Sequence, residues 1–231
     1  MTQPRSLSQR AYEAIKRKIV TLELAPGSVI DETALQEELG LGRTPIREAL
    51  KRLALEKLVT ILPRRGMFVT EIGIADLTRL YEVRIDLEAL AARLAARRGR
   101  AEHWERMAAA LSRIPRDTDH DTLIAIDETC HQIMYQAADN AFLADMLNAL
   151  YALSLRLWYF ALAEIGDMHD TVMEHQLILE ALQAGDEERA AAILSEHINT
   201  FQEEIQSAMV GATTARRLDE ATLAGMAPAS A

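Results

Sequence analysis

The segment AIDETCHQIMYQ, residues 125–136, carries an aspartate and a histidine four positions apart in an otherwise apolar stretch. Residues four apart share one face of a helix, so Asp127 and His131 are expected to point the same way. Apolar residues surround the pair on that face, which indicates that it faces the protein core. A carboxylate and an imidazole aimed into a core need a physical reason.

Two later histidines have the same kind of setting. His175 lies in a helical stripe with Val172 and Leu179, and His197 lies in another with Phe201. An unpaired buried polar group costs roughly 1–3 kcal/mol, and an unpaired carboxylate costs more. A single buried histidine is usually a hydrogen-bonded core residue. An aspartate and three histidines that converge would instead be satisfied together by one divalent metal ion, because imidazole and carboxylate are ligands of such ions.

If the helices that carry them converge, Asp127, His131, His175 and His197 would form a metal site; if they do not, each is a hydrogen-bonded core residue. Zinc is the expected ion, with nickel or another transition metal as the alternative.

An arginine also interrupts an apolar stripe, in LTRLYEVRIDLEAL. Arg84 could form a buried ion pair with Glu88 at i+4, or extend its charged end to water. It could equally bind an anion, because a guanidinium grips a carboxylate with two parallel hydrogen bonds. Arg156 is a second candidate for this role, although its segment LSLRLWYF fits a core or dimer pattern. Tyr81 and Tyr135 are candidates to line the same pocket or to belong to the core.

Two regions of different pattern must position these residues. Apolar residues at helical spacing predict helices over about 74–98, 101–114, 119–137, 140–165, 168–184 and 186–210. The N-terminal region instead predicts short helices around a glycine-containing turn, then the strands LVTILP and MFVTEI around RRG. We expect a mainly α protein with a winged helix-turn-helix at 1–72 and its β-hairpin wing. An all-helical bundle follows at 73–210, with a flexible tail at 211–231.

The helix within LGRTPIREALKRLALEKL has the features of a DNA-reading helix. Thr44 is expected to cap it, and Pro45 suits its first helical position. Arg43, Arg47 and Lys51 fall on a stripe opposite the apolar one, and arginine can bind guanine O6 and N7 together. In the hairpin turn, Arg64, Arg65 and Gly66 could contact phosphates or the minor groove. The candidate DNA-contacting residues are Arg43, Thr44, Pro45, Arg47, Lys51, Arg64, Arg65 and Gly66. The alternative is an amphipathic helix with a solvated basic face.

Charge and composition set limits on this interpretation. The net charge of −10 argues against nucleic acid, but residues 1–70 hold 12 Lys and Arg against 8 Asp and Glu. This asymmetry favours a mildly basic N-terminal region, the head, followed by an acidic remainder of the chain, the body. The single cysteine, Cys130, excludes an internal disulfide framework, and Asp145, Asn148 and Arg156 break the most apolar region. With no visible secretory signal, a cytoplasmic protein without a membrane span is expected.

The motif LGLGRTPIREALKRLALEKLV, followed by RRGMFV, resembles the winged helix of the GntR family of bacterial transcription regulators. The helical body resembles the metal-binding, FCD-type effector domain of that family's FadR branch, so the resemblance covers about residues 8–210. It implies DNA-contacting roles for Arg43, Thr44, Arg47 and Gly66. One position departs from the pattern, because Thr33 stands where the family often has a DNA-contacting arginine. The nearby Glu32, Glu37 and Glu38 would weaken phosphate affinity.

For the body, the resemblance implies a metal held by an Asp-x-x-x-His pair and two later histidines. Asp127, His131, His175 and His197 match that order. It also implies that an arginine on the first body helix, here Arg84, holds a small organic acid effector beside the metal. The expected protein is a homodimeric, metabolite-responsive regulator, by default a repressor, that reads an inverted-repeat operator in double-stranded DNA.

Two other functions compete with this one. A metal held by three histidines and an aspartate could activate water in a hydrolase-like enzyme, but no paired general base is visible and the basic head would be unexplained. A helical dimerisation module with a structural polar core would hold neither metal nor small molecule.

Overall fold

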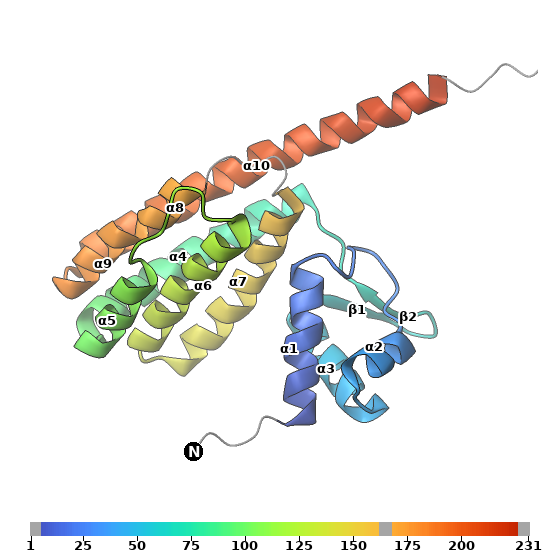
Figure 1. Cartoon of the computed structure of the whole chain (residues 1–231), viewed down its shortest axis with the longest axis horizontal. Coiled ribbons are helices and arrows are strands. Elements are labelled where there is room, and N and C mark those ends of the chain that lie inside the picture. The colour runs from blue at the N-terminus through green and yellow to red at the C-terminus, as the bar shows by residue number, and fades with distance from the viewer. Residues whose placement is uncertain (1–5, 162–167, 226–231) are drawn as a thin grey trace, which may run out of the picture. The chain divides into compact units, whose positions relative to one another are not determined.

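The computed structural model describes residues 6–161 and 168–225 (Figure 1). The chain divides into two compact units. The first contains the residues up to Asp76 together with Ala152–Phe160, and the second contains the rest. The expected boundary between residues 72 and 73 falls just before helix α4, whereas the unit boundary falls within its first turn.

The first unit contains three helices and a hairpin. They are α1 (Leu7–Val20), α2 (Glu32–Leu39), α3 (Arg43–Leu55), β1 (Val59–Leu62) and β2 (Gly66–Val69). Side chains cap the first two helices: Ser6 accepts from the Gln9 amide, and Asp31 accepts from the amides of Thr33 and Ala34. Gly40, in the left-handed conformation with φ of 62°, ends α2 and turns the chain toward α3.

The cap expected at Thr44 is wrong. Helix α3 begins at Arg43, and its N-cap is Gly42, which makes no side-chain capping bond. Glycine is tolerated at this position, so the helix starts two residues earlier than a cap at Thr44 would place it. Pro45 is therefore the third residue of the helix and not the first, as expected.

Apolar faces of α1, α2 and α3 share one core with the start of β1 and with β2. Its most deeply buried side chains include Ile15, Ile19, Ile46, Leu50, Leu53 and Leu58. Leu153, on the part of α7 that belongs to this unit, packs against the same core. That contact explains why 152–160, expected in the helical body, groups with the first unit.

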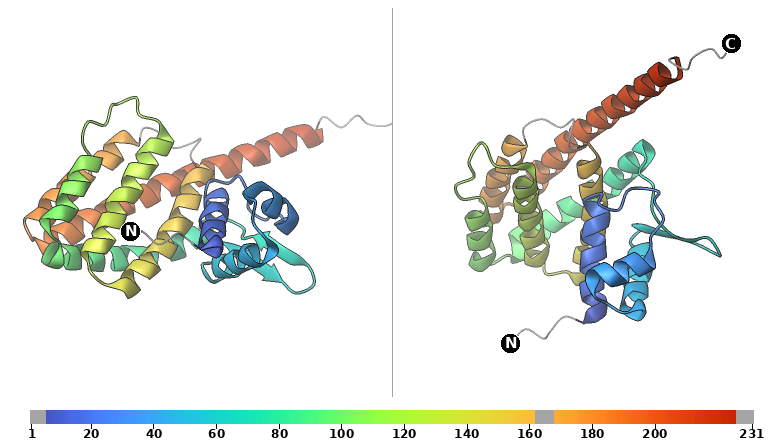
Figure 2. Two further views of the ribbon diagram at one scale, coloured as in Figure 1. Left: turned by 60° about the horizontal axis from the view of Figure 1, so that its bottom comes forward. Right: turned by 45° about the vertical axis from the view of Figure 1, so that its right-hand side comes forward.

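All the secondary-structure elements described in the second unit are helices. Its elements are α4 (Ile74–Arg98), α5 (Ala101–Ala110), α6 (His120–Ala137), α7 (Ala141–Ala161), α8 (His169–Met173), α9 (His175–Gln183) and α10 (Glu187–Gly225). Neighbouring helices α6 and α7 run side by side in both figures, and the Gln132 side chain donates to Asn148 between them at 2.7 Å (Figures 1 and 2). Helix α5 packs against α6 and α9, and α10 packs against α9.

Two bidentate ion pairs join the start of α10 to α4. Arg93 binds Glu188 through Nε and Nη2 at 2.9 and 3.0 Å, and Arg97 binds Glu187 in the same way. Bidentate geometry fixes direction as well as distance, so these pairs help to set the position of α10 beside α4.

Three predicted helices differ from the structure. The helix expected over 101–114 ends at Ala110 as α5. Of the helix expected over 140–165, residues 162–165 lie outside the described residues. The helix expected over 168–184 is divided at Glu174 into α8 and α9, although the φ of −57° and ψ of −26° of this residue remain in the helical region. Helix α10 continues to Gly225, past the end expected at residue 210, since this segment is rich in the good helix formers alanine, leucine and arginine. The flexible tail expected at 211–231 is therefore helical as far as Gly225, and residues 226–231 lie outside the described residues. No helix in the described part of the chain is long and apolar enough to cross a membrane. The mainly α fold with a two-stranded wing is as the sequence predicts.

Candidate functional site

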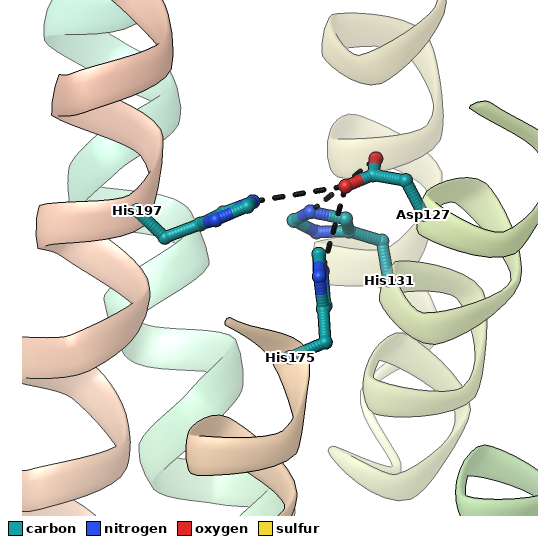
Figure 3. A group of neighbouring side chains, drawn as sticks. All are labelled: Asp127, His131, His175 and His197. Atoms are coloured by element: carbon teal, nitrogen blue, oxygen red, sulfur yellow. Dashed lines mark ion pairs between the residues drawn. The ribbon is translucent and has the colours of Figure 1, made fainter. Parts of the chain in front are cut away.

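Three helices of the second unit bring the four predicted metal ligands together. Asp127 and His131 come from α6, His175 from the first residue of α9, and His197 from α10. Their ligand atoms all lie within 4.8 Å of one another, and no side chain is more than 4% exposed (Figure 3).

The aspartate lies at the centre of the group. Asp127 Oδ1 is 3.5 Å from His175 Nε2 and 3.7 Å from His197 Nε2, and Oδ2 is 3.8 Å from His131 Nε2 (Figure 3). Ligands of one ion at about 2.1 Å are at most about 4.2 Å apart. A small contraction of the group would therefore place all four atoms on one ion.

Each histidine is held by a hydrogen bond on its outer nitrogen. His131 Nδ1 lies 3.2 Å from Glu88 Oε2, His175 Nδ1 lies 3.1 Å from the Val172 carbonyl, and His197 Nδ1 lies 2.8 Å from Glu174 Oε2. All three partners are acceptors, so each neutral imidazole carries its proton on Nδ1. The Nε2 lone pairs are then free to bind a metal, which is the arrangement that outer partners impose on ligating histidines.

The carboxylate has an outer partner as well. Tyr151 Oη donates to Asp127 Oδ2 at 2.7 Å. Each of the four predicted ligands thus has a partner that orients it. The sequence did not predict these hydrogen bonds of Tyr151, Val172 and Glu174. Tyr151 and Glu174 bind ligands that lie on other elements, and Val172 binds through its backbone carbonyl.

Three buried atoms of the cluster have no hydrogen-bond partner among the described residues: Asp127 Oδ1, His131 Nε2 and His175 Nε2. Leaving three such groups unpaired in a core is costly. They belong to residues whose other polar atoms are bonded, and they face one another. This donor set, three neutral imidazole nitrogens and one carboxylate oxygen, fits a divalent transition metal.

The electrostatics of the protein alone agree with a cation site. Burial by itself would raise the pKa of Asp127, but the three histidines, His131 foremost, outweigh it and hold the pKa well below its usual range. Burial and the neighbouring charge of His197 lower the pKa of His175 to about 3. Burial would also lower the pKa of His197, but contacts with Asp127 and Glu174 raise it to about 9. Without a metal, His197 is therefore protonated beside the Asp127 carboxylate at neutral pH. A metal ion would take the place of that proton.

Arg84 and Glu88 form the buried ion pair that is one of the three interpretations of the arginine. Arg84 Nε donates to Glu88 Oε1 at 3.1 Å, and both side chains are at most 2% exposed. The guanidinium carbon lies 5.7 Å from the ring centre of Tyr81 and 5.2 Å from that of Tyr151. Burial would lower the pKa of Arg84, but Glu88 outweighs it and the pKa is raised, so the side chain stays charged.

Arg156 lies elsewhere. It belongs to the part of α7 that groups with the first unit, and its guanidinium donates to the Thr70 carbonyl. Burial lowers its pKa to about 10, against the opposing influence of Glu71. None of its described contacts is with the Asp–His cluster, so the structure does not bring this effector candidate to the metal ligands.

In the first unit, α3 presents the predicted DNA-contacting residues at its N-terminal end. Arg43, Thr44 and Lys51 are exposed, while Pro45 and Arg47 are partly buried, and Ile46 beneath them is fully buried. The first amides of a helix point away from it and attract a phosphate. This end of α3 is therefore suited to approach a DNA backbone and the adjoining base edges.

The hairpin forms the predicted wing. Its strands pair in antiparallel register from Val59 with Val69 to Leu62 with Gly66. Arg64, Arg65 and Gly66 at its tip are exposed, and Gly66 has φ of 107°, which favours glycine.

The acidic residue Glu32 lies against the DNA-reading helix. Its Oε2 atom is 3.6 Å from Nε of Arg47, and that oxygen is buried. The carboxylate therefore restrains a predicted base-contacting arginine and places a negative charge where a phosphate would approach.

We expect Glu32→Gln to raise affinity for DNA of any sequence a few-fold, because a phosphate no longer competes with the carboxylate. Fluorescence anisotropy with operator and random duplexes would measure this. Glu37→Gln, which removes a charge from the same helix, is the control and is expected to act more weakly. Equal effects of the two substitutions would show that the contact with Arg47 has no role.

Comparison with known proteins agrees with both units. Residues 7–69 match the model for bacterial regulatory proteins of the gntR family, and residues 79–200 match the model for the FCD domain. The chain therefore belongs to the GntR family of bacterial transcription regulators and carries an FCD domain as its helical unit. Members of this family bind DNA.

The relatives are transcription regulators. The chain is 26% identical to the Escherichia coli HTH-type transcriptional repressor RspR over 89% of its length and 90% of that protein. It is 29% identical to a probable D-xylose utilization operon transcriptional repressor of Paenarthrobacter nicotinovorans, over 80% and 84%. The fold of Escherichia coli McbR/YncC aligns with a TM-score of 0.79 at 22% identity, covering 88% and 99%. These relatives favour a regulator over the metal-dependent hydrolase considered from the sequence.

Proposed function

We propose that this GntR-family regulator is a metabolite-responsive repressor whose FCD domain binds a divalent metal ion and a small organic acid. The observation that carries the proposal is the convergence of Asp127 Oδ1, His131 Nε2 and His175 Nε2, three buried atoms without hydrogen-bond partners among the described residues. Asp127, His131, His175 and His197 would hold the ion, which would supply a positively charged anchor for a carboxylate. Zinc is the expected ion.

Arg84 would be the second contact for the acid. Its guanidinium is charged, buried and close to Tyr151, whose hydroxyl group binds Asp127. Arg84 donates to Glu88 through Nε. An arginine also donates to carboxylates through its terminal nitrogens, Nη1 and Nη2, and these would be the contacts with the acid. Tyr81, fully buried beside Arg84, would form part of the wall.

Arg43, Thr44, Pro45, Arg47, Lys51, Arg64, Arg65 and Gly66 would contact DNA. A homodimer would present two such heads to an inverted repeat, since the two-fold symmetry of a protein is mirrored in its operator. The acid would relieve repression only if it binds one arrangement of the heads more tightly than another. Repression as the direction of control is supported by the names of relatives such as RspR.

A thermal-shift screen tests the proposal. Small organic acids are added to metal-loaded and to chelator-treated protein, and metal content is measured on the same samples. A ligand at 100 times its Kd stabilises the folded state by about 2.7 kcal/mol, which raises the melting temperature measurably. We expect some acids to stabilise only the loaded protein. Protein that takes up no metal and responds to no acid would contradict the proposal and favour a structural polar core.

A further inference from the structure

The charge of the candidate site is set by few residues. Among the residues that the structure describes, three charged side chains in and around the metal cluster are at least nine-tenths buried: Asp127, Glu88 and Arg84. The histidines bind a metal as neutral imidazoles. With a divalent ion, the buried groups would therefore carry one positive charge in total.

The negative charge of Glu88 lowers this total from two positive charges to one. Its Oε1 accepts from Arg84 Nε at 3.1 Å and from Tyr135 Oη at 2.5 Å, and its Oε2 lies 3.2 Å from Nδ1 of the metal ligand His131. Three donors on one fully buried carboxyl group are what an ionised carboxylate requires. The residue thus neutralises the arginine and orients a metal ligand at the same time.

We infer that Glu88 is a specificity-determining residue that makes the site select monocarboxylates over dicarboxylates. The inference rests on the proposed function and adds to it the charge of the effector. A bound monoanion would bring the buried charge to zero, whereas a dianion would leave one uncompensated negative charge in a region of low dielectric. Uncompensated buried charge is costly, and at an effective dielectric constant of 20 one extra charge several ångströms away changes affinity roughly tenfold or more.

Glu174 provides a matched comparison. Like Glu88, it accepts a hydrogen bond from Nδ1 of a ligand histidine, here His197 at 2.8 Å. Unlike Glu88, its side chain is 43% exposed, so water screens its charge. Both residues should support metal binding, but only Glu88 should decide the charge of the acid. Replacing an outer partner of a ligand typically lowers metal affinity by about 10–100-fold.

The test uses full-length, zinc-loaded protein and two pairs of acids that have nearly the same shape. Succinamate and malonamate carry one charge, and succinate and malonate carry two. Calorimetry and thermal shift measure binding of each acid to wild type, Glu88→Gln and Glu174→Gln. Competition with a chelator measures zinc affinity of all three without any acid.

We expect wild type and Glu174→Gln to bind the amide member of each pair roughly tenfold or more tightly than the diacid. Glu88→Gln should lose or reverse that order, and both substitutions should weaken zinc binding. Wild type that binds diacids equally or better would overturn the inference while the proposed function stands, and so would Glu88→Gln with unchanged preference. If neither class binds zinc-loaded wild type, the proposed acid site and this inference both fall. If Glu88→Gln does not fold, the binding of the two amide–diacid pairs to wild type still tests the inference.

Discussion

Replacing His175 with alanine is expected to abolish stoichiometric metal binding. The imidazole supplies one of four convergent ligand atoms, and its Nε2 lies 3.5 Å from Asp127 Oδ1. Loss of a direct ligand should exceed the roughly 10–100-fold loss of affinity that follows removal of an outer partner. Stabilisation by metal, about 4 kcal/mol at 1,000 times the Kd, should disappear with it. Metal content after dialysis and melting temperature with and without zinc would measure both effects.

His169→Ala is the matched control. His169 is also a buried histidine of the same unit, six residues earlier, but its Nε2 contacts the Ile114 carbonyl and it is not part of the cluster. Its substitution should lower stability yet leave metal content and the zinc-dependent rise in melting temperature intact. Equal metal binding by wild type and His175→Ala would show that the cluster is not the site.

Replacing Arg47 with alanine is expected to remove sequence preference in DNA binding. Arg47 is on the first turns of α3, next to the exposed Arg43 and Thr44. If its guanidinium binds a guanine edge, the substitution should cost about 1–3 kcal/mol on the operator and little on random DNA. Anisotropy titrations of both duplexes at several salt concentrations would show the difference.

Lys51→Ala separates base contacts from phosphate contacts. Lys51 is exposed one turn further along α3, where a phosphate contact is expected. Its loss should weaken operator and random DNA alike and reduce the salt slope by about one. An Arg47→Ala protein that behaves in the same way would mean that Arg47 contacts only the backbone.

The sequence predicted most reliably what a single helix determines. Asp127 and His131 share a face because four residues make about one turn, and this geometry needs no tertiary information. The GntR motif likewise predicted α3 and the wing, since the turn residues and apolar spacing are local. By contrast, the meeting of His175 and His197 with that face depends on packing among α6, α9 and α10, so it could only be inferred by resemblance.

The residues that hydrogen-bond to the outer nitrogens of the histidines could not be predicted either, because these contacts also depend on how the helices pack. Glu88 was considered as a partner of Arg84, but its contact with His131 joins residues 43 apart in the chain. Val172 contributes a carbonyl group, which any residue carries, and Glu174 reaches His197 from the short break between α8 and α9. The helix ends were missed where a glycine served as cap, at Gly42, and where alanine-rich sequence prolonged α10.

In the proposed function, a small acid bound with the metal controls DNA binding. The most direct measurement is binding of metal-loaded protein to its own promoter DNA by anisotropy, with and without an acid that stabilises it in the thermal-shift screen. Chelator-treated protein and His175→Ala serve as controls. We predict that the acid lowers promoter affinity of the loaded protein several-fold and leaves both controls unchanged. If the acid binds but promoter affinity is the same with and without it, the acid does not regulate DNA binding and the proposed function is wrong.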